Sequence, residues 1–231
     1  MKKALLSLAI LMSLSIIFSV SCGANLQAPS GELPAWKVGD TWTIKVTLKW
    51  LYENESVSTV VYSVISEQAY NGMDCYIVKT QDTTTSTSIP LGFNTIQAYD
   101  KTTLRIIGTT DALNLSETNS STFFLNTSIQ YSAKPYPLSV GKTWTTTDNT
   151  TYIEENQTTT VNSSSIYKVE GIESITVPAG TFNCFKIVIY SNKNEPLETY
   201  WVTDVTKGFP VKRISNQGAF TTELVSYSIS K

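Results

Sequence analysis

The chain has no histidine at all. Histidine is the base of Ser-His-Asp and Cys-His nucleophile systems and a usual ligand of zinc and haem. Its absence excludes those nucleophile systems and any histidine-ligated zinc or haem site. The sequence also lacks a Gly-x-Ser-x-Gly elbow, a Gly-rich phosphate loop and an Asp-rich calcium loop. We therefore predict no metal, no cofactor and no catalytic residues, and any enzyme would have to work with carboxylates.

Charged residues are also few. Asp, Glu, Lys and Arg together form 16% of the chain, whereas about 25% is usual for a soluble domain. The formal net charge is −2 and the basic residues form no cluster, so we do not expect nucleic acid as a partner. Serine and threonine take the place of the charged residues, which is common in proteins exposed outside the cell.

The first residues have the pattern of an export signal. An apolar run from Ala4 to Val20 follows two lysines, and small residues surround Cys22. This order is that of a secretory signal, to which we assign residues 1–22. Residues Val20–Gly23 resemble the lipobox of bacterial lipoproteins, which implies that Cys22 becomes the lipidated first residue of the mature protein. The alternative is plain secretion with cleavage close to Cys22.

Alternating apolar and polar residues predict strands in the rest of the chain, where no sustained helical period occurs. The alternation is clearest between Trp42 and Tyr52, where every second residue is aliphatic or aromatic. Strands of this kind have one buried face, and a long one can curve. We predict an all-β fold, as a curved antiparallel sheet or half-barrel.

One motif occurs twice. Val38–Thr43 reads VGDTWT and Val140–Thr145 reads VGKTWT, and each copy is followed further on by a cysteine, an aromatic residue and aliphatic residues. Blocks that recur in the same order indicate a duplicated unit. We therefore predict that the domain consists of two tandem pseudo-repeats, at about residues 36–110 and 136–231.

Two cysteines remain besides Cys22, namely Cys75 and Cys184, at corresponding points of the two pseudo-repeats. Disulfides persist in exported proteins, so one interpretation is a bridge that links the two halves. The other is that both are small buried apolar side chains, because free cysteine is among the most buried residue types.

The acceptor pattern of N-glycosylation, Asn-x-Ser/Thr, recurs along the chain and marks exposed positions. It begins at Asn54, Asn114, Asn119, Asn126, Asn149, Asn156 and Asn162. These asparagines carry sugars if the host glycosylates its surface proteins, and otherwise they indicate polar hairpins at the rim of the sheet.

Three stretches near the C-terminus have the pattern of a known signature. Val177–Ile187 (VPAGTFNCFKI), Tyr200-Trp201 and Gly208–Ile214 (GFPVKRI) are similar to a signature of uncharacterised secreted β-rich families of unknown function, and Trp36–Trp42 is similar to their opening. Some of these families resemble the lipoprotein-carrier (LolA/LolB) superfamily, in which a curved sheet forms a half-barrel around an apolar cleft. The resemblance implies that architecture and supplies no catalytic residue.

These patterns divide the chain into a signal sequence (1–22), a flexible tether (23–35) and one β domain (36–231). We expect an exported, lipid-anchored, non-enzymatic protein at the outer face of the membrane or in the cell envelope. Its expected role is to bind a small apolar or lipid-like ligand, or a partner, on its sheet. The alternatives are a structural surface protein with an exposed Thr/Asn-rich rim and, third, a carboxylate-based hydrolase.

Overall fold

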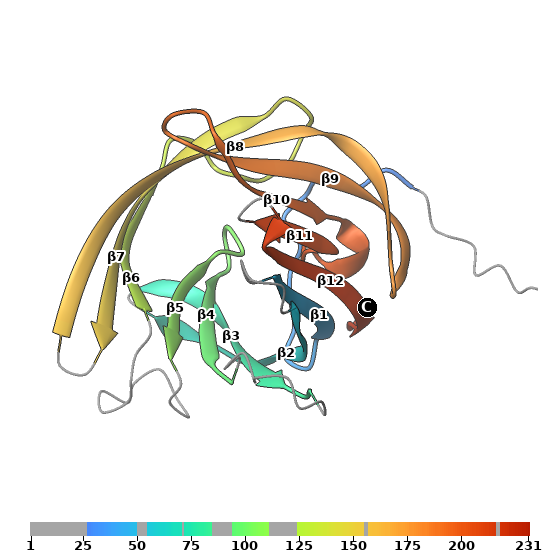
Figure 1. Cartoon of the computed structure of the whole chain (residues 1–231), viewed down its shortest axis with the longest axis horizontal. Helices are drawn as coiled ribbons and strands as arrows, with labels where there is room; N and C mark the ends of the chain where they lie inside the picture. The colour runs from blue at the N-terminus through green and yellow to red at the C-terminus, as the bar shows by residue number, and fades with distance from the viewer. Residues whose placement is uncertain are drawn as a thin grey trace, which may run out of the picture.

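The structure is a computed structural model in which the chain forms one antiparallel sheet. It describes residues 27–49, 55–70, 72–84, 94–110, 124–154, 157–215 and 218–231. Within these ranges the chain forms twelve β-strands and one short 3₁₀ helix (Figure 1). The predicted all-β fold and the curved antiparallel sheet are therefore confirmed.

The strands follow one another along the chain, and the 3₁₀ helix Asp204–Thr206 lies between β10 and β11. They are β1 (Thr41–Lys49), β2 (Glu55–Tyr70), β3 (Met73–Asp82), β4 (Ile96–Asp100), β5 (Ile106–Thr110), β6 (Phe124–Tyr131), β7 (Thr143–Glu154), β8 (Gln157–Val177), β9 (Gly180–Ser191), β10 (Pro196–Val202), β11 (Lys212–Ser215) and β12 (Phe220–Ser228).

Each strand pairs with the strands before and after it in the chain, and β12 pairs with β1. The pairing order therefore closes into a ring, which goes further than an open half-barrel. The contact between β5 and β6 is the narrowest, since it consists of two residue pairs, Gly108 with Leu125 and Thr109 with Phe124. Figure 1 shows β8 and β9 arching over the sheet and the C-terminus lying beside β1.

Both copies of the repeated motif form the same turn at the start of a long strand. Gly39 donates its N–H to the carbonyl of Val64 at 2.9 Å, and Gly141 donates to that of Val169 at 2.8 Å. The two glycines have φ values of 95° and 85°, a region that other residues rarely adopt. The motif thus has one local structure in both places, and the duplication of the whole unit stays a prediction.

The largest hydrophobic core lies inside the ring at the end where β1 begins. On β1, Trp42, Ile44 and Val46 are buried, as the alternation predicted. The Trp42 ring stacks on Phe209, with 4.7 Å between centroids, and Trp36 packs against Trp42 at 4.8 Å. Apolar burial of these large rings is the main source of stability at this end.

The segment before β1 crosses the same end of the ring. Gly31 accepts a hydrogen bond from the Leu138 N–H at 2.6 Å, and the Trp36 indole donates to the carbonyl of Lys207 at 2.8 Å. Gly31 has a φ of +78°, and a β-carbon there would lie 2.2 Å from the Leu138 oxygen, so only glycine fits. The part of the predicted tether from Pro29 to Pro34 therefore lies against the domain.

A fully buried carboxylate, Asp40, fastens three segments together at this end. It accepts hydrogen bonds from Lys207 Nζ at 2.8 Å, from the Ser230 N–H at 2.7 Å and hydroxyl at 2.9 Å, and from the Lys37 N–H at 2.8 Å. Burial by itself raises the pKa of this carboxyl, but the bonds from Lys207, Ser230 and Lys37 outweigh it and hold the pKa below the ordinary value of 3.8.

We expect Asp40→Asn to lower the free energy of unfolding by about 3–5 kcal/mol near neutral pH, the range for breaking a buried ion pair. The folded-state pKa of Asp40 is depressed, so its contribution is complete above the ordinary value of 3.8 and is lost as the pH falls through the lower folded value. The difference between wild type and variant should therefore shrink on acidification. Urea unfolding across this pH range measures it.

Asp74→Asn is the matched control, because Asp74 is exposed at the start of β3. It should change the free energy of unfolding by about 0.5 kcal/mol or less. Equal effects of the two substitutions, or a difference between wild type and Asp40→Asn that is independent of pH, would contradict the role given to Asp40.

Candidate functional site

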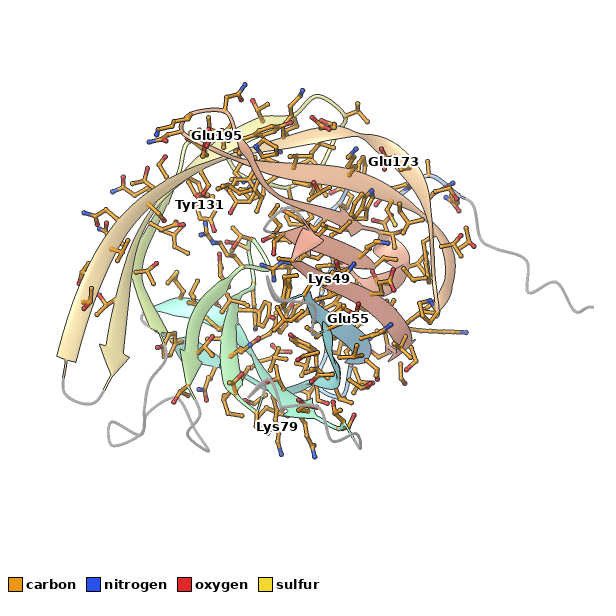
Figure 2. The ribbon with its side chains drawn as sticks, in the orientation of Figure 1. Lys49, Glu55, Lys79, Tyr131, Glu173 and Glu195 are labelled. Carbon is orange, nitrogen blue, oxygen red and sulfur yellow. The ribbon has the colours of Figure 1, made fainter. Side chains whose placement is uncertain are left out.

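The candidate site is a cavity of about 410 Å³ inside the ring of strands. Its volume lies within the range of about 300–1,000 Å³ that is usual for small-molecule sites. Side chains from both halves of the chain line it, and Figure 2 labels one of them, Tyr131. The same figure labels Glu173, which lies outside the cavity and binds Lys186 on the outer face of the sheet.

The closed end of the cavity is apolar. Trp36, Leu138, Phe209 and Trp144 line it there, and all four are buried. The Trp144 ring stacks on Tyr167 with centroids 5.0 Å apart and an angle of 13° between the planes. Trp144 in the second half of the chain is therefore buried and stacked on an aromatic ring, as Trp42 is in the first half.

An ion pair between Arg105 and Asp148 lies on one side of the cavity. The Asp148 side chain is 4% exposed, and Arg105 Nη2 donates to its Oδ2 atom. Tyr131 and Tyr167 lie close enough to the guanidinium to influence the pKa of Arg105. Among the described residues, Arg105 Nη1 and Asp148 Oδ1 are buried and have no hydrogen-bond partner. One donor and one acceptor of the same pair are therefore unused.

A second ion pair, between Arg213 on β11 and Glu198 on β10, lies on another part of the wall. Arg213 Nη2 donates to the Glu198 carboxylate at 2.7 Å, and the guanidinium lies 5.4 Å from the centre of the Phe220 ring. Tyr62 and Tyr99 are its tyrosine neighbours. Both arginines therefore have one carboxylate and two tyrosines around them.

The tyrosines in the wall stay neutral. Burial raises the pKa of Tyr99 and Tyr200 well above the ordinary value of 10 and raises that of Tyr136 to about 12. Their hydroxyl groups can therefore donate and accept hydrogen bonds at any physiological pH. The wall offers neutral hydroxyls and two ion pairs whose charges cancel.

The two carboxylates at the cavity, Asp148 and Glu198, each bind an arginine, so neither is arranged as a proton donor or acceptor for a substrate. In the described ranges, no three His, Cys, Asp or Glu side chains come close enough together to hold a metal ion. The arrangement suits reversible binding through hydrogen bonds and apolar contact.

Sequence reasoning missed Arg105, Asp148 and Arg213. A usable signal existed for Asp148, because Thr146 and Asp148 follow Trp144 at steps of two along β7 and so share its face. All three of these β7 residues are buried. No such signal existed for the arginines, whose partners are fixed by strand pairing.

Both cysteines outside the signal sequence are free and buried. Cys75 lies in a cluster with Ile77 and Ala98, whereas Cys184 belongs to the main core, so the predicted bridge between them is absent. The reason is the ring, in which their strands β3 and β9 are separated by five strands in either direction. The alternative interpretation, two small buried apolar side chains, describes them. Burial raises the pKa of Cys75 to about 11 and that of Cys184 to about 12.

Two of the predicted glycosylation sites, Asn149 and Asn162, are exposed and stand opposite each other in the pairing of β7 with β8. Asn126 lies on β6, and its side chain is not among those described. The predictions for the other four asparagines and for lipidation of Cys22 fall outside the described residues. These are Asn54, Asn114, Asn119 and Asn156.

We expect Cys75 and Cys184 to resist thiol reagents in the folded protein and to react fully in denaturant, because both are buried with raised pKa values. Mass spectrometry after alkylation with and without denaturant measures this. Cys22→Ser provides a background in which only these two thiols remain. A mass that rises by two hydrogens on reduction would instead show an intramolecular disulfide.

The fold and the cavity define an all-β protein whose antiparallel strands enclose a space lined by aromatic residues and paired charges. The chain belongs to the DUF3108-like family, whose model matches residues 52–205, more than half of its length. The match includes Val177–Ile187 and Tyr200-Trp201 of the predicted signature and leaves out Gly208–Ile214 and Trp36–Trp42. A comparison with curated proteins gave no match.

Three solved structures are similar to the chain at low identity. The hypothetical lipoprotein YmcC from Escherichia coli K12 is 14% identical over 84% of this chain and 85% of its own, with a TM-score of 0.43. A candidate exported protein of YmcC-like fold from Bacteroides fragilis NCTC 9343 is 11% identical over 85% and 99%, with a TM-score of 0.38. A candidate lipoprotein from Parabacteroides distasonis ATCC 8503 is 14% identical over 87% and 100%, with a TM-score of 0.38.

A likeness of this size says nothing about function, and the LolA/LolB-like half-barrel stays a prediction. The described part of the chain contains no helix with the length and apolar character that a transmembrane segment requires.

Proposed function

We propose that this protein is an exported, lipid-anchored protein of the cell envelope that binds a small amphipathic molecule inside its ring of strands and catalyses no reaction. The observation that carries the proposal is the cavity of about 410 Å³, which has an apolar closed end and a wall of paired charges and neutral tyrosines. An apolar site with a few convergent polar groups is the usual form of a small-molecule site.

The order of groups in the cavity supports an amphipathic ligand. Trp36 and Phe209 line one end, and an aliphatic or aromatic part of a ligand buried there gains about 25 cal/mol for each Å² removed from water. Tyr131 and Tyr200 line the same cavity and offer hydroxyl groups for a polar part. A purely apolar molecule would leave these polar groups without new partners, at a cost.

Export and anchoring rest on the N-terminal sequence. Two lysines, the apolar run from Ala4 to Val20 and the lipobox-like residues around Cys22 support both steps. Pro29, seven residues after Cys22, is buried, and from there onward the chain lies against the domain. The anchor would therefore hold the closed end of the ring near the membrane.

A structural role at the surface is the second candidate function. The observation that favours it is the polar hairpin of β7 and β8, where Asn149 and Asn162 are exposed within threonine- and serine-rich sequence. A protein of this kind would need no ligand, so binding measurements separate the two functions.

We expect the neutral dye Nile red to bind the wild-type protein with a saturable rise in fluorescence, and Thr222→Trp to weaken that binding at least about tenfold, which is about 1.4 kcal/mol. Thr222 lines the cavity and is buried, so a tryptophan there fills space that a ligand would use. Fluorescence titration measures the affinity.

Thr221→Trp is the matched control, because the neighbouring residue on a strand points to the opposite face of the sheet. It should bind the dye as the wild type does, and thermal unfolding of both variants checks that they are folded. No saturable binding to the wild type, or equal binding to the two variants, would exclude the cavity as the binding site and favour the structural role.

We expect the full chain, made in a bacterial host with its signal, to start at Cys22 and to carry lipid on that residue. Intact-mass measurement of the detergent-extracted protein gives the mass of the attached lipid. Cys22→Ser should lose this mass and leave the detergent phase, while dye binding stays unchanged. An unmodified N-terminus beyond Cys22 in the wild type would mean plain secretion.

A further inference from the structure

We infer that the cavity selects an amphiphile whose polar part is uncharged and carries a hydroxyl or amide group, in preference to a fatty acid or an alkyl amine. This inference rests on the proposed function and names the chemistry of the ligand. It follows from the charges of the wall, from its hydroxyl groups and from the apolar rings that line the same cavity.

The charges at the cavity cancel within pairs. Among the described residues that line it, the charged ones are Arg105, Arg213 and Glu198, and Asp148 is bound to Arg105. Each arginine therefore has its own carboxylate. A carboxylate or ammonium group that enters such a site either displaces a partner or stays unpaired, and an unpaired buried charge costs several kcal/mol. An uncharged polar group meets no such penalty.

The hydroxyl groups of the wall offer both kinds of hydrogen bond. Tyr136 and Tyr200 line the cavity, and each neutral hydroxyl can donate one hydrogen bond and accept others. A buried polar group without a partner costs about 1–3 kcal/mol, so a ligand group that both donates and accepts gains affinity. Hydroxyl and amide groups donate and accept at once, whereas a carboxylate only accepts and an ammonium only donates.

Each ion pair lies some way along a strand from a buried tryptophan. Asp148 is four residues further along β7 than Trp144, which belongs to the apolar cluster. Arg213 pairs with Thr222, which pairs with Val46, and Val46 is four residues further along β1 than Trp42. An amphiphile can therefore place its chain among the rings and its polar group beside an ion pair.

Three probes with the same decyl chain test the inference: monodecanoylglycerol, decanoate and decylamine, which are neutral, negative and positive at neutral pH. We expect the wild type to bind monodecanoylglycerol at least about tenfold more tightly than either ion. A tenfold difference in affinity corresponds to only a small part of the cost of an unpaired buried charge. Titration calorimetry, or displacement of Nile red, measures the three affinities for the full chain.

Variants that remove one charge of an ion pair should then change which of the three probes the cavity prefers. Asp148→Asn leaves Arg105 without its carboxylate, and Glu198→Gln does the same for Arg213, so both should move the preference toward decanoate by at least about tenfold. Arg105→Gln leaves a carboxylate and should move it toward decylamine. A change in stability alone would not move the affinities for the two ions in opposite directions.

Glu67→Gln is the control, because it removes the same charge from a residue that pairs with Lys101 and does not line the cavity. It should leave the order of the three probes unchanged. The two carboxylate variants act on independent pairs, so a failure of one to fold leaves the other as the test. If no probe binds the wild type, the proposed function fails. If decanoate or decylamine binds best, or the variants keep the wild-type order, the cavity binds ligands but this inference is overturned.

Discussion

The buried carboxylate of Asp40 holds the closed end of this protein together. It joins the turn before β1, the loop around Lys207 and the C-terminal Ser230, three segments that only the tertiary structure brings together. Lys207 in turn presents its carbonyl to the Trp36 indole, so the same loop also fixes the tryptophan that lines the cavity. The apolar end of the cavity therefore depends on a polar network that is fully satisfied, as buried networks must be to stabilise a fold.

The two ion pairs at the cavity depend on the pairing order of the strands. Glu198 and Arg213 meet because β10 and β11 are neighbours, and Asp148 reaches Arg105 across β6. In each ion pair the contact with the partner offsets part of the cost of taking a charge out of water, and the two charges cancel. A site of this kind suits recognition by shape and hydrogen bonding.

Several elements of the fold were predictable because the signal is local. Steps of two from Trp42 to Val46 predicted a strand with one buried face, and the structure confirms it. The VGDTWT and VGKTWT motifs predicted similar local structures, and Gly39 and Gly141 do form the same turn. Of the two interpretations of Cys75 and Cys184, the structure shows two free buried thiols, for a reason that lies outside local sequence. Corresponding cysteines of two halves are brought together only if their strands are neighbours, and β3 and β9 are on opposite parts of the ring.

The sequence by itself determined the strand content, the buried face of β1 and the exclusion of histidine chemistry, because these follow from residue type and from the period of two along a strand. Only the tertiary structure decided that β12 returns to β1, that residues 27–36 lie across one end, and that two arginines find carboxylates inside the ring. Those features come from contacts between residues far apart in the chain, whose partners are set by strand register and ring closure. Neither strand register nor ring closure can be predicted from a single stretch of sequence.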